Sequence, residues 1–268
     1  IGIAIAVIVI VMAYHNLPSL DVLTAYRPKI PLRIYSADGH LIGEFGEERR
    51  AVVTIGDVPK VMKQAILAAE DDRFYQHGGI DYAGILRAAA TNLAGGSKRQ
   101  GASTITQQVA RNFFLSGEKT YTRKLYEVLL SFKIESNLSK DQIFELYINQ
   151  IFLGQRAYGF AAAAQIYYGK PLKDISIAEA AMLAGLPKAP SAYNPIVNPK
   201  RAKIRQQYVL RRMHDLGYIT DVQFEESGKE ALVIKREMMD YSVHAEFIAE
   251  MARQITAERF PAEVYSRG

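Results

Sequence analysis

Acidic, aromatic and glycine residues gather in the stretch AAEDDRFYQHGGID, residues 68–81, directly behind an apolar run. Glu70 ends that run, so apolar neighbours would keep its carboxylate partly desolvated and raise its basicity. A carboxylate in such a place suits a general base that takes a proton from a substrate hydroxyl. The alternative is structural: Asp72 and Arg73 pair on the surface and Glu70 is solvated. His77, taken alone, is more often a structural histidine than a catalyst.

Two further segments carry groups that suit a sugar or a phosphate. In GASTITQQVARN, residues 101–112, hydroxyls and amides stand at a predicted helix start, a place that favours anions. In EKTYTRKLYE, residues 118–127, Glu127 lies one helical turn beyond Arg123. A capped helix with a polar face and a surface ladder of ion pairs are the structural alternatives. The cations of the two segments are Arg111, Lys119, Arg123 and Lys124.

Together the three segments offer a base, a group of fixed cations and a second carboxylate. That set suits the displacement of a phosphate leaving group, because the base activates a hydroxyl while the cations hold the departing charge.

The elements that would position these groups are mainly α-helical. The run PLRIYSADGHLIGEF, with Asp38-Gly39 at its centre, predicts a β-hairpin. Ser139 with Gln142, and Ser176 with Glu179, form capping boxes ahead of helices. Apolar periodicity predicts the other helices: one ending at Glu70, one from Asp81 to Ala94, one beginning at Ser103 or Thr104, and others over about 121–136, 199–216 and 243–260.

Composition limits the class of protein. The 268 residues are 49% hydrophobic, enough for a sizeable core, and contain no Cys, which excludes disulfides and thiol chemistry. The net charge of +5 favours acidic partners: nucleic acid, anionic lipid or a phosphate-bearing substrate.

The opening segment, IGIAIAVIVIVMAY at residues 1–14, predicts a truncated transmembrane helix. As a helix it would rise about 21 Å, less than the hydrocarbon core of about 30 Å. A buried core helix is the alternative, whereas a signal peptide is disfavoured because no cleavage site of the A-x-A kind follows. Two prolines in residues 15–30, Pro18 and Pro28, indicate a membrane-proximal linker.

These motifs resemble those of the peptidoglycan glycosyltransferase domain of class A (bifunctional) penicillin-binding proteins, which is related to monofunctional peptidoglycan glycosyltransferases. The pattern E-D-x-x-F-x-x-H-x-G is met by Glu70, Asp71, Phe74, His77 and Gly79. The later motifs follow in order: G-x-S-T-I-T-Q-Q at 101–108, R-K-x-x-E at 123–127, KDQIFELYIN at 140–149, and a fifth over 158–195.

The resemblance implies an enzyme that polymerises lipid II into glycan strands. Glu70 would deprotonate the acceptor sugar 4-hydroxyl, which displaces undecaprenyl pyrophosphate with inversion, and Glu127 would be the second essential carboxylate. A Mg²⁺ or Mn²⁺ ion held with the pyrophosphate could assist, with no organic cofactor. Arg111, which is often Lys in the family, keeps the charge but changes the hydrogen-bond geometry. The implied substrate-binding residues are Asp71, His77, Ser103, Thr104, Gln107, Gln108, Arg111, Lys119, Arg123 and Lys124, of which Asp71 and His77 would hold the first motif in shape.

The implied architecture is a lysozyme-like, two-lobed α-helical domain around a cleft. It would be carried by a single-pass protein of the bacterial inner membrane, with the catalytic side in the periplasm and cell-wall synthesis machinery as possible partners. No nucleic acid partner is expected. The expected parts are a membrane helix at 1–14, a linker and hairpin at 15–50, the glycosyltransferase domain at 51–228, and at 229–268 the start of a linker to a transpeptidase domain whose K-T-G element the chain lacks.

Two alternatives come from different classes. A lysozyme-like hydrolase acting on peptidoglycan would also use two carboxylates, but it needs neither the cations nor the anchor. A membrane-tethered binding module could use the basic segment PKRAKIRQQYVLRRM, residues 199–213, although its apolar residues keep the spacing of an inward-facing helix stripe. A last hypothesis pairs ALVIK, residues 231–235, with the hairpin as a third strand.

Overall fold

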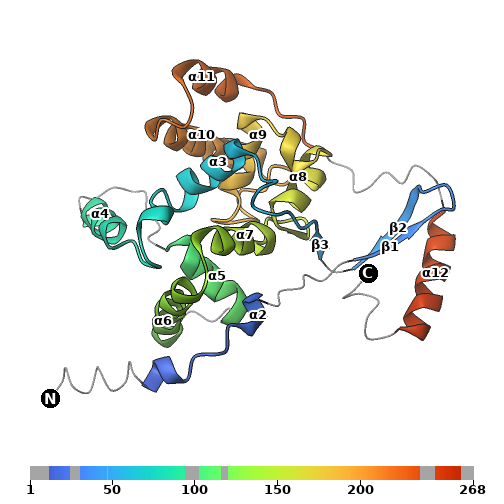
Figure 1. The fold of residues 1–268 in the computed structure, drawn as a ribbon. Helices are drawn as coiled ribbons and strands as arrows, with labels where there is room; N and C mark the ends of the chain where they lie inside the picture. The colour runs from blue at the N-terminus through green and yellow to red at the C-terminus, as the bar shows by residue number, and fades with distance from the viewer. Residues whose placement is uncertain are drawn as a thin grey trace. The chain divides into compact units, whose positions relative to one another are not determined.

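The chain is mainly α-helical with two small sheets (Figure 1). The computed structural model describes residues 12–24, 31–46, 48–93, 103–115, 120–235 and 245–260. The first half contains α2 (Asp21–Thr24), β1 (Leu32–Tyr35), β2 (Leu41–Phe45), β3 (Arg49–Arg50), α3 (Lys60–Glu70), η1 (Phe74–Gln76), α4 (Tyr82–Leu93), α5 (Ile105–Phe114) and α6 (Tyr121–Asn137). The second half contains α7 (Lys140–Gln150), β4 (Ala157–Tyr158), α8 (Phe160–Tyr168), η2 (Leu172–Asp174), α9 (Ile177–Gly185), α10 (Pro199–Asp215), α11 (Asp221–Lys229) and α12 (Glu246–Arg259).

The chain divides into two compact units. Unit 1 comprises residues 1–26 and 66–147, and unit 2 comprises residues 27–65 and 148–268. The division falls inside α3 and α7. The predicted cleft between two lobes and the predicted domain boundaries stay predictions.

Unit 1 is built around α5 and α6, which pack against each other. The helix α5 begins where the sequence predicts, because Thr104 and Gln107 form a capping box at its start. The apolar sides of the helices bury a core that includes Phe74, Ile105, Leu130, Ile134, Ile143 and Phe144, all fully buried. The segment ahead of α2 is tied to α6, because Lys133 Nζ donates to the Pro18 carbonyl at 2.9 Å.

Unit 2 is built around three helices, α8, α9 and α10, in which small side chains allow close packing. Four consecutive alanines, 161–164, are buried in α8, and α9 packs along α10. A Cβ added to Gly185 of α9 would lie 2.8 Å from Cγ of Arg205 of α10, so the helices approach closely only because this residue is glycine. The Ser176–Glu179 capping box opens α9 as predicted.

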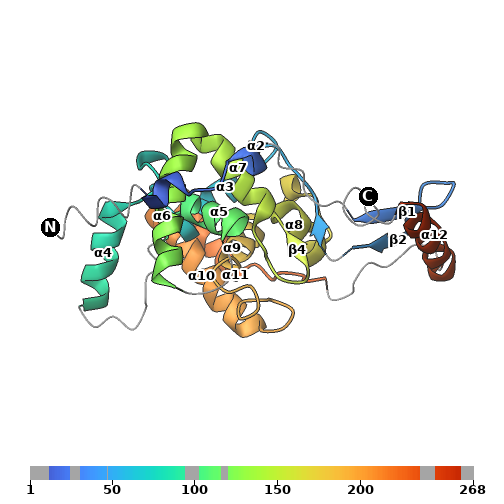
Figure 2. The same cartoon turned by 90° about the horizontal axis from the view of Figure 1, so that it is seen from below.

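The two small sheets differ in kind. β1 and β2 form the predicted antiparallel hairpin, and Gly39 supplies the positive φ (85°) in its turn. α12 lies along this hairpin in both views (Figure 2) and contacts both strands. β3 and β4 form a two-residue parallel pair.

The prediction of a third strand at residues 231–235 is wrong. These residues form no strand, and the sheet contains β1 and β2 alone among the described residues. Lys235 instead donates its backbone N–H to the Tyr167 carbonyl at 2.8 Å. The hairpin is covered by α12, where a Cβ on Gly43 would meet the Cβ of Ala249 at 2.7 Å. Burial of the apolar strand residues is therefore supplied by a helix.

The predicted transmembrane helix at 1–14 falls largely on residues 1–11, which lie outside the described part of the chain. Within the described residues, each helix is too short or too polar to cross a bilayer.

Candidate active site

Glu70 is the last residue of α3, as predicted, and is half-buried. Its Oε2 accepts a hydrogen bond from Nε2 of Gln108 at 2.8 Å. Gln108 lies in α5 with only 5% of its surface exposed, so an almost fully buried amide fixes the carboxylate. The structure thus joins the first and second motifs at the residue predicted to be the base.

Asp71 fastens the turn after Glu70 to α5. Its carboxylate lies 2.9 Å and 3.1 Å from Nε2 of His77 and accepts the backbone N–H of Ile105 at 3.0 Å. That N–H belongs to the first turn of α5, where it has no partner within the helix. The predicted role of Asp71 and His77 in holding the loop is consistent with these contacts, since one carboxylate joins both ends of the loop to the helix.

Gly79 completes the loop at a position that only glycine fits. Its φ is 86°, and an added Cβ would lie 3.2 Å from the backbone oxygen of Ser131 of α6. Thr104 donates its hydroxyl to the Gly79 carbonyl at 2.6 Å. The loop is therefore held between the start of α5 and the middle of α6.

Glu127 is 1% exposed and is bonded to two cations of its own helix. Its Oε2 accepts from Nη1 of Arg123 at 3.0 Å, and its Oε1 accepts from Nζ of Lys124. Lys124 also donates to the hydroxyl of Ser103 at 3.3 Å, beside the start of α5. The Nε of Arg123 is buried and has no hydrogen-bond partner among the described residues. The third motif is thus a charged group held by one buried carboxylate rather than an exposed ion-pair ladder.

The other predicted cations are less completely placed. Arg111 lies in the last turn of α5 and is half-buried. Lys119 lies outside the described residues. Glu70 is connected to α5 through Gln108, and Glu127 is connected through Lys124 to Ser103, two residues ahead of α5.

Three polar residues of unit 1, Thr106, Glu135 and Lys140, are bonded to one another beside the first and second motifs, and the motif patterns predict no role for them. Glu135 accepts from the hydroxyl of Thr106 at 2.5 Å and from Nζ of Lys140 at 2.7 Å. Thr106 and Lys140 stand inside the second and fourth motifs, which could have drawn attention to them. The only sequence sign for Glu135 is its spacing of eight residues, about two helical turns, from Glu127.

The described residues do not fit a divalent cation bound by the protein alone. No group of three His, Asp or Glu side chains in the described ranges is arranged to hold a metal. Both oxygens of Glu127 already accept hydrogen bonds from cationic side chains.

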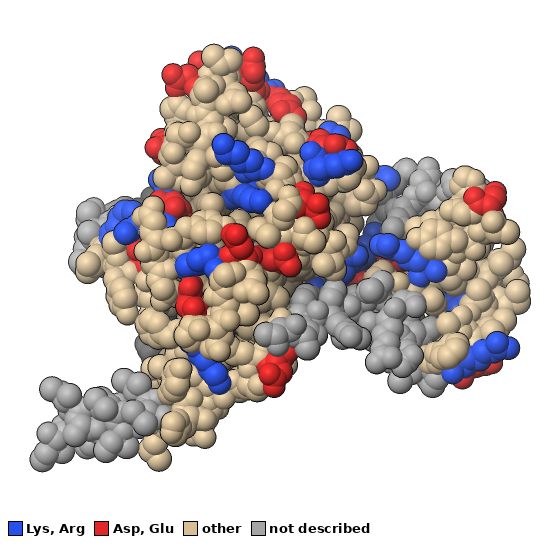
Figure 3. All heavy atoms as spheres, in the orientation of Figure 1, with Lys and Arg blue, Asp and Glu red and all other residues tan. Residues whose placement is uncertain are grey.

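The basic helix α10 is an element of the core rather than a basic arm. Ala202, Val209, Leu210 and Met213 are buried against its neighbours, as the inward-facing alternative predicted. Arg205 is 7% exposed and stacks on the ring of Tyr208 at 4.5 Å. On the face shown in Figure 3, basic and acidic side chains are interspersed. The binding-module alternative loses its main support.

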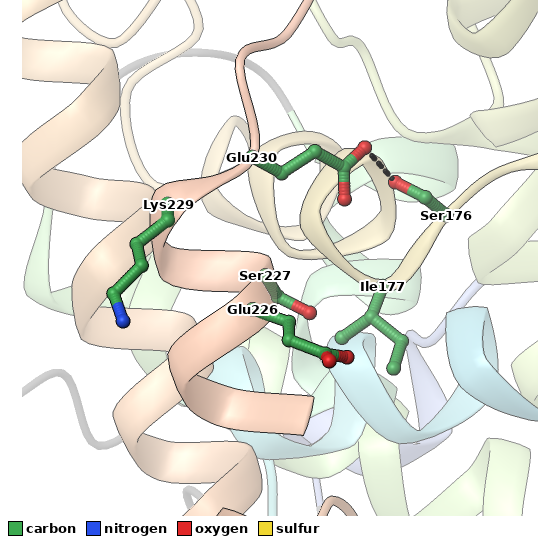
Figure 4. Close-up of a pocket in the computed structure, with 6 residues that line it drawn as sticks. All are labelled: Ser176, Ile177, Glu226, Ser227, Lys229 and Glu230. Carbon is green, nitrogen blue, oxygen red and sulfur yellow. Dashed lines mark hydrogen bonds between the residues drawn. The ribbon is translucent and has the colours of Figure 1, made fainter. Parts of the chain in front are cut away.

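A hollow in unit 2 lies between the start of α9 and the end of α11 (Figure 4). It is lined by Ser176, Ile177, Glu226, Ser227, Lys229 and Glu230. The hydroxyl of Ser176 donates to Glu230 at 2.7 Å and also caps α9, so these groups have structural partners. The hollow contains no predicted site residue.

Comparison with known proteins agrees with the motif assignment. The family described as Transglycosylase matches residues 38–214. Penicillin-binding protein 1A of Neisseria meningitidis is 56% identical over 267 residues, which cover 100% of this chain and 34% of that protein. Penicillin-binding protein 1A of Pseudomonas aeruginosa is 48% identical over 253 residues, covering 94% of this chain and 31% of that protein.

A solved structure shares the fold. The crystal structure of penicillin-binding protein 1A from Haemophilus influenzae matches with a TM-score of 0.53 and 32% sequence identity, over 90% of this chain and 26% of that one. The chain spans about a third of the length of the curated relatives described above.

Proposed function

The chain belongs to the transglycosylase family, and we propose that it is a peptidoglycan glycosyltransferase that extends glycan strands from lipid II with Glu70 as the general base. The observation that carries the proposal is the hydrogen bond from buried Gln108 to Glu70, because it fixes a carboxylate at the end of an apolar helix. A base held in one orientation loses little entropy when it meets its substrate.

The proposed reaction is an inverting displacement. Glu70 takes the proton from the 4-hydroxyl of the acceptor sugar while that oxygen attacks the anomeric carbon of the donor. The bond from the anomeric carbon to the pyrophosphate oxygen breaks, and its electron pair leaves with undecaprenyl pyrophosphate. The hydrogen bond from Nε2 of Gln108 to Oε2 orients the Glu70 carboxylate for this proton transfer.

We propose that Arg123 and Lys124 stabilise the negative charge that develops on the pyrophosphate. Glu127 supports them, because a buried carboxylate bonded to both cations fixes their positions before substrate arrives. The Nε of Arg123, which has no partner among the residues that the structure describes, is a donor that an added phosphate oxygen could satisfy. Arg111 and Lys119 complete the proposed phosphate-binding set, and Ser103, Thr104, Gln107 and Gln108 the proposed sugar-binding set.

We propose that any Mg²⁺ or Mn²⁺ ion arrives with the pyrophosphate and is bound mainly by phosphate oxygens. The support is indirect: the described residues offer no group of carboxylates for such an ion. Titration of the substrate-free chain with Mn²⁺ should show no tight site, whereas binding in the presence of pyrophosphate would support the proposal.

We propose a bacterial inner-membrane location, with residues 1–14 as part of a single-pass anchor and the catalytic domain in the periplasm. The uncharged opening segment and the lipid-linked substrate support this proposal. The finer fold features, a lysozyme-like pair of lobes and a transpeptidase half elsewhere in the native protein, are proposed on the same family resemblance. Contacts with other cell-wall synthesis proteins are proposed on the family membership.

The test compares Glu70→Gln with Asp72→Asn, which neutralises a carboxylate two residues away that pairs with Arg87 at 3.5 Å. Both variants should fold, as circular dichroism would show. Glu70→Gln should lose lipid II polymerisation by about 10²- to 10⁴-fold, and Asp72→Asn should keep it. Polymerisation by Glu70→Gln at the wild-type rate would refute the assignment.

The same proteins offered intact sacculi test the hydrolase alternative. A peptidoglycan glycosyltransferase releases no fragments from finished, phosphate-free polymer. Release of fragments by the wild type, lost in Glu70→Gln, would instead support a hydrolase.

A further inference from the structure

Glu135 joins three parts of unit 1 that are separate in the sequence. Its Oε1 accepts from the hydroxyl of Thr106 in α5 at 2.5 Å and from Nζ of Lys140 at the start of α7 at 2.7 Å. Its Cγ lies 3.3 Å from the position of a Cβ added to Gly79, so the stem of the side chain lies against the loop that follows α3. Thr106 is fully buried, and the Glu135 side chain is only 12% exposed.

Lys140 extends these contacts to the first motif. Its Nζ lies 4.3 Å from the centroid of the Phe74 ring while it donates to Glu135. Phe74 is fully buried and stands four residues after Glu70. An ammonium over an aromatic face is held by the ring quadrupole as well as by its carboxylate partner. The Lys140–Glu135 pair therefore contacts the loop that carries Glu70 from the side of α6 and α7.

The same pair contacts α5 close to Gln108. Thr106 precedes Gln108 by two residues in one rigid helix, so the hydroxyl of Thr106 fixes the rotation and height of α5 at the amide that binds Glu70. The start of α5 is tied separately to the loop, by Asp71 to the Ile105 N–H and by Thr104 to the Gly79 carbonyl. The contact with Glu135 adds a tie at Thr106, which relates α5 to α6 and, through Lys140, to α7.

We propose that Glu135 and Lys140 are positioning residues of the glycosyltransferase reaction, which hold Glu70 and Gln108 in register through Thr106 and Phe74. The inference rests on the proposed role of Glu70 as base. Neither residue touches the proposed reacting atoms. A partly buried ion pair adds little to stability, because the partial desolvation of both charges offsets their attraction. It is a good device for orientation, since its hydrogen bonds are directional.

The test uses Thr106 because its two substitutions separate the hydrogen bond from packing. Thr106→Val keeps the shape and removes the donor, and Thr106→Ser keeps the donor and removes a methyl group. Each is measured in the full 268-residue chain in detergent with lipid II, at a temperature where circular dichroism shows every variant folded. Thr106→Val should lower kcat about tenfold or more with KM changed less than about twofold, and Thr106→Ser should restore most of kcat.

A double-mutant cycle with Gln108→Leu then distinguishes positioning from a merely structural role. If Thr106 acts through the Gln108–Glu70 contact, Thr106→Val should change kcat less than about twofold in the Gln108→Leu background. Lys140→Met, which keeps the stem over Phe74 but removes the charge, should behave like Thr106→Val. The matched control is Arg33→Met, which breaks a 2.9 Å pair with Glu44, whose side chain is 3% exposed, in the hairpin. Its kcat should be unchanged.

A wild-type kcat in Thr106→Val would overturn the inference. So would a double variant whose loss of kcat equals the product of the losses in Thr106→Val and Gln108→Leu. An active Glu70→Gln would instead overturn the proposed function itself. An inactive Glu70→Gln beside a fully active Thr106→Val would refute the positioning role alone.

Discussion

The helices α5 and α9 have almost the same length, 10 and 9 residues, and both are deeply buried, yet they bury different chemistry. In α5 the buried residues include Thr106, Gln107 and Gln108. In α9 they are small or apolar from Ala180 to Gly185, and the one buried charge, Glu179, closes the capping box. Both helices begin with a capping box, so they differ in the kind of side chain that each buries beyond its first turn.

The difference separates the residues that position chemistry from those that supply packing. A buried polar group without a partner costs about 1–3 kcal/mol, so polar residues persist in α5 because each has a specific partner outside or at the end of the helix. In α9 and α10 close approach of the helices supplies the stability. Substitutions around α5 should therefore change activity, and substitutions around α8 to α10 should change stability alone.

Among the substitutions that test this comparison of stability with activity, Glu127→Gln should have the largest effect. It leaves Arg123 and Lys124 without their buried negative partner, which should cost about 3–5 kcal/mol of unfolding free energy and lower lipid II polymerisation about a hundredfold. Urea denaturation and a polymerisation assay measure the two effects. The control is Glu225→Gln, which removes an exposed carboxylate paired with Lys229 at 3.4 Å and should change neither quantity. Full activity in a folded Glu127→Gln would remove Glu127 from the site.

Gly159→Ala should affect stability without affecting chemistry. Gly159 caps α8 with φ 87°, and an added Cβ would lie 2.9 Å from the Asn149 carbonyl oxygen, so the cost should be about 2–4 kcal/mol. Gly39→Ala is the matched comparison, because its φ of 85° is similar but nothing lies within 4 Å, and it should cost about 1–2 kcal/mol. The kcat of the folded fraction should be unchanged in both. Equal costs would show that the close approach at Gly159 is unimportant.

Tyr168→Phe should have the smallest effect at neutral pH and a visible one in alkali. The Tyr168 hydroxyl is buried with no partner among the described residues, and burial, with the charges of Glu179 and Glu230, raises its pKa. Because the pKa of Tyr168 is higher in the folded chain than its ordinary value of 10.0, the unfolded chain loses this proton at a lower pH than the folded chain does. The contribution of Tyr168 to the unfolding free energy is therefore complete below pH 10 and is lost as the pH rises above 10.

The unfolding free energy of Tyr168→Phe should thus lie within about 0.5 kcal/mol of the wild type at pH 7 and fall less steeply above pH 10. Tyr167→Phe is the comparison, because the Tyr167 hydroxyl donates to the Leu153 carbonyl at 2.9 Å and its loss should cost about 1 kcal/mol at pH 7. If the unfolding free energies of Tyr168→Phe and the wild type fell equally steeply above pH 10, the pKa of Tyr168 would not be raised in the folded chain.

Several helix starts, the end of α3 and the hairpin turn could be predicted from the sequence, because each depends on residues only a few positions apart. Residues within about four positions determine each of these features. These features are the helix starts at Thr104 and Ser176, the turn at Asp38-Gly39 and the end of α3 at Glu70. The covering of the hairpin by α12 was not predicted, since apolar strand residues do not show whether a strand or a helix buries them. The contact of Glu135 with Thr106 was not predicted either. It joins two helices at residues 29 positions apart, and the periodicity of one helix does not show which other helix it contacts.

The most direct test of the central claim, that the Glu70 carboxylate acts chemically on a sugar hydroxyl, is rescue of Glu70→Ala by formate. The variant should fold, as circular dichroism would show, and should not polymerise lipid II. Formate should restore polymer and release of undecaprenyl pyrophosphate in proportion to its concentration, and it should not accelerate the wild type. Polymerisation by Glu70→Ala at the wild-type rate without formate would contradict the claim.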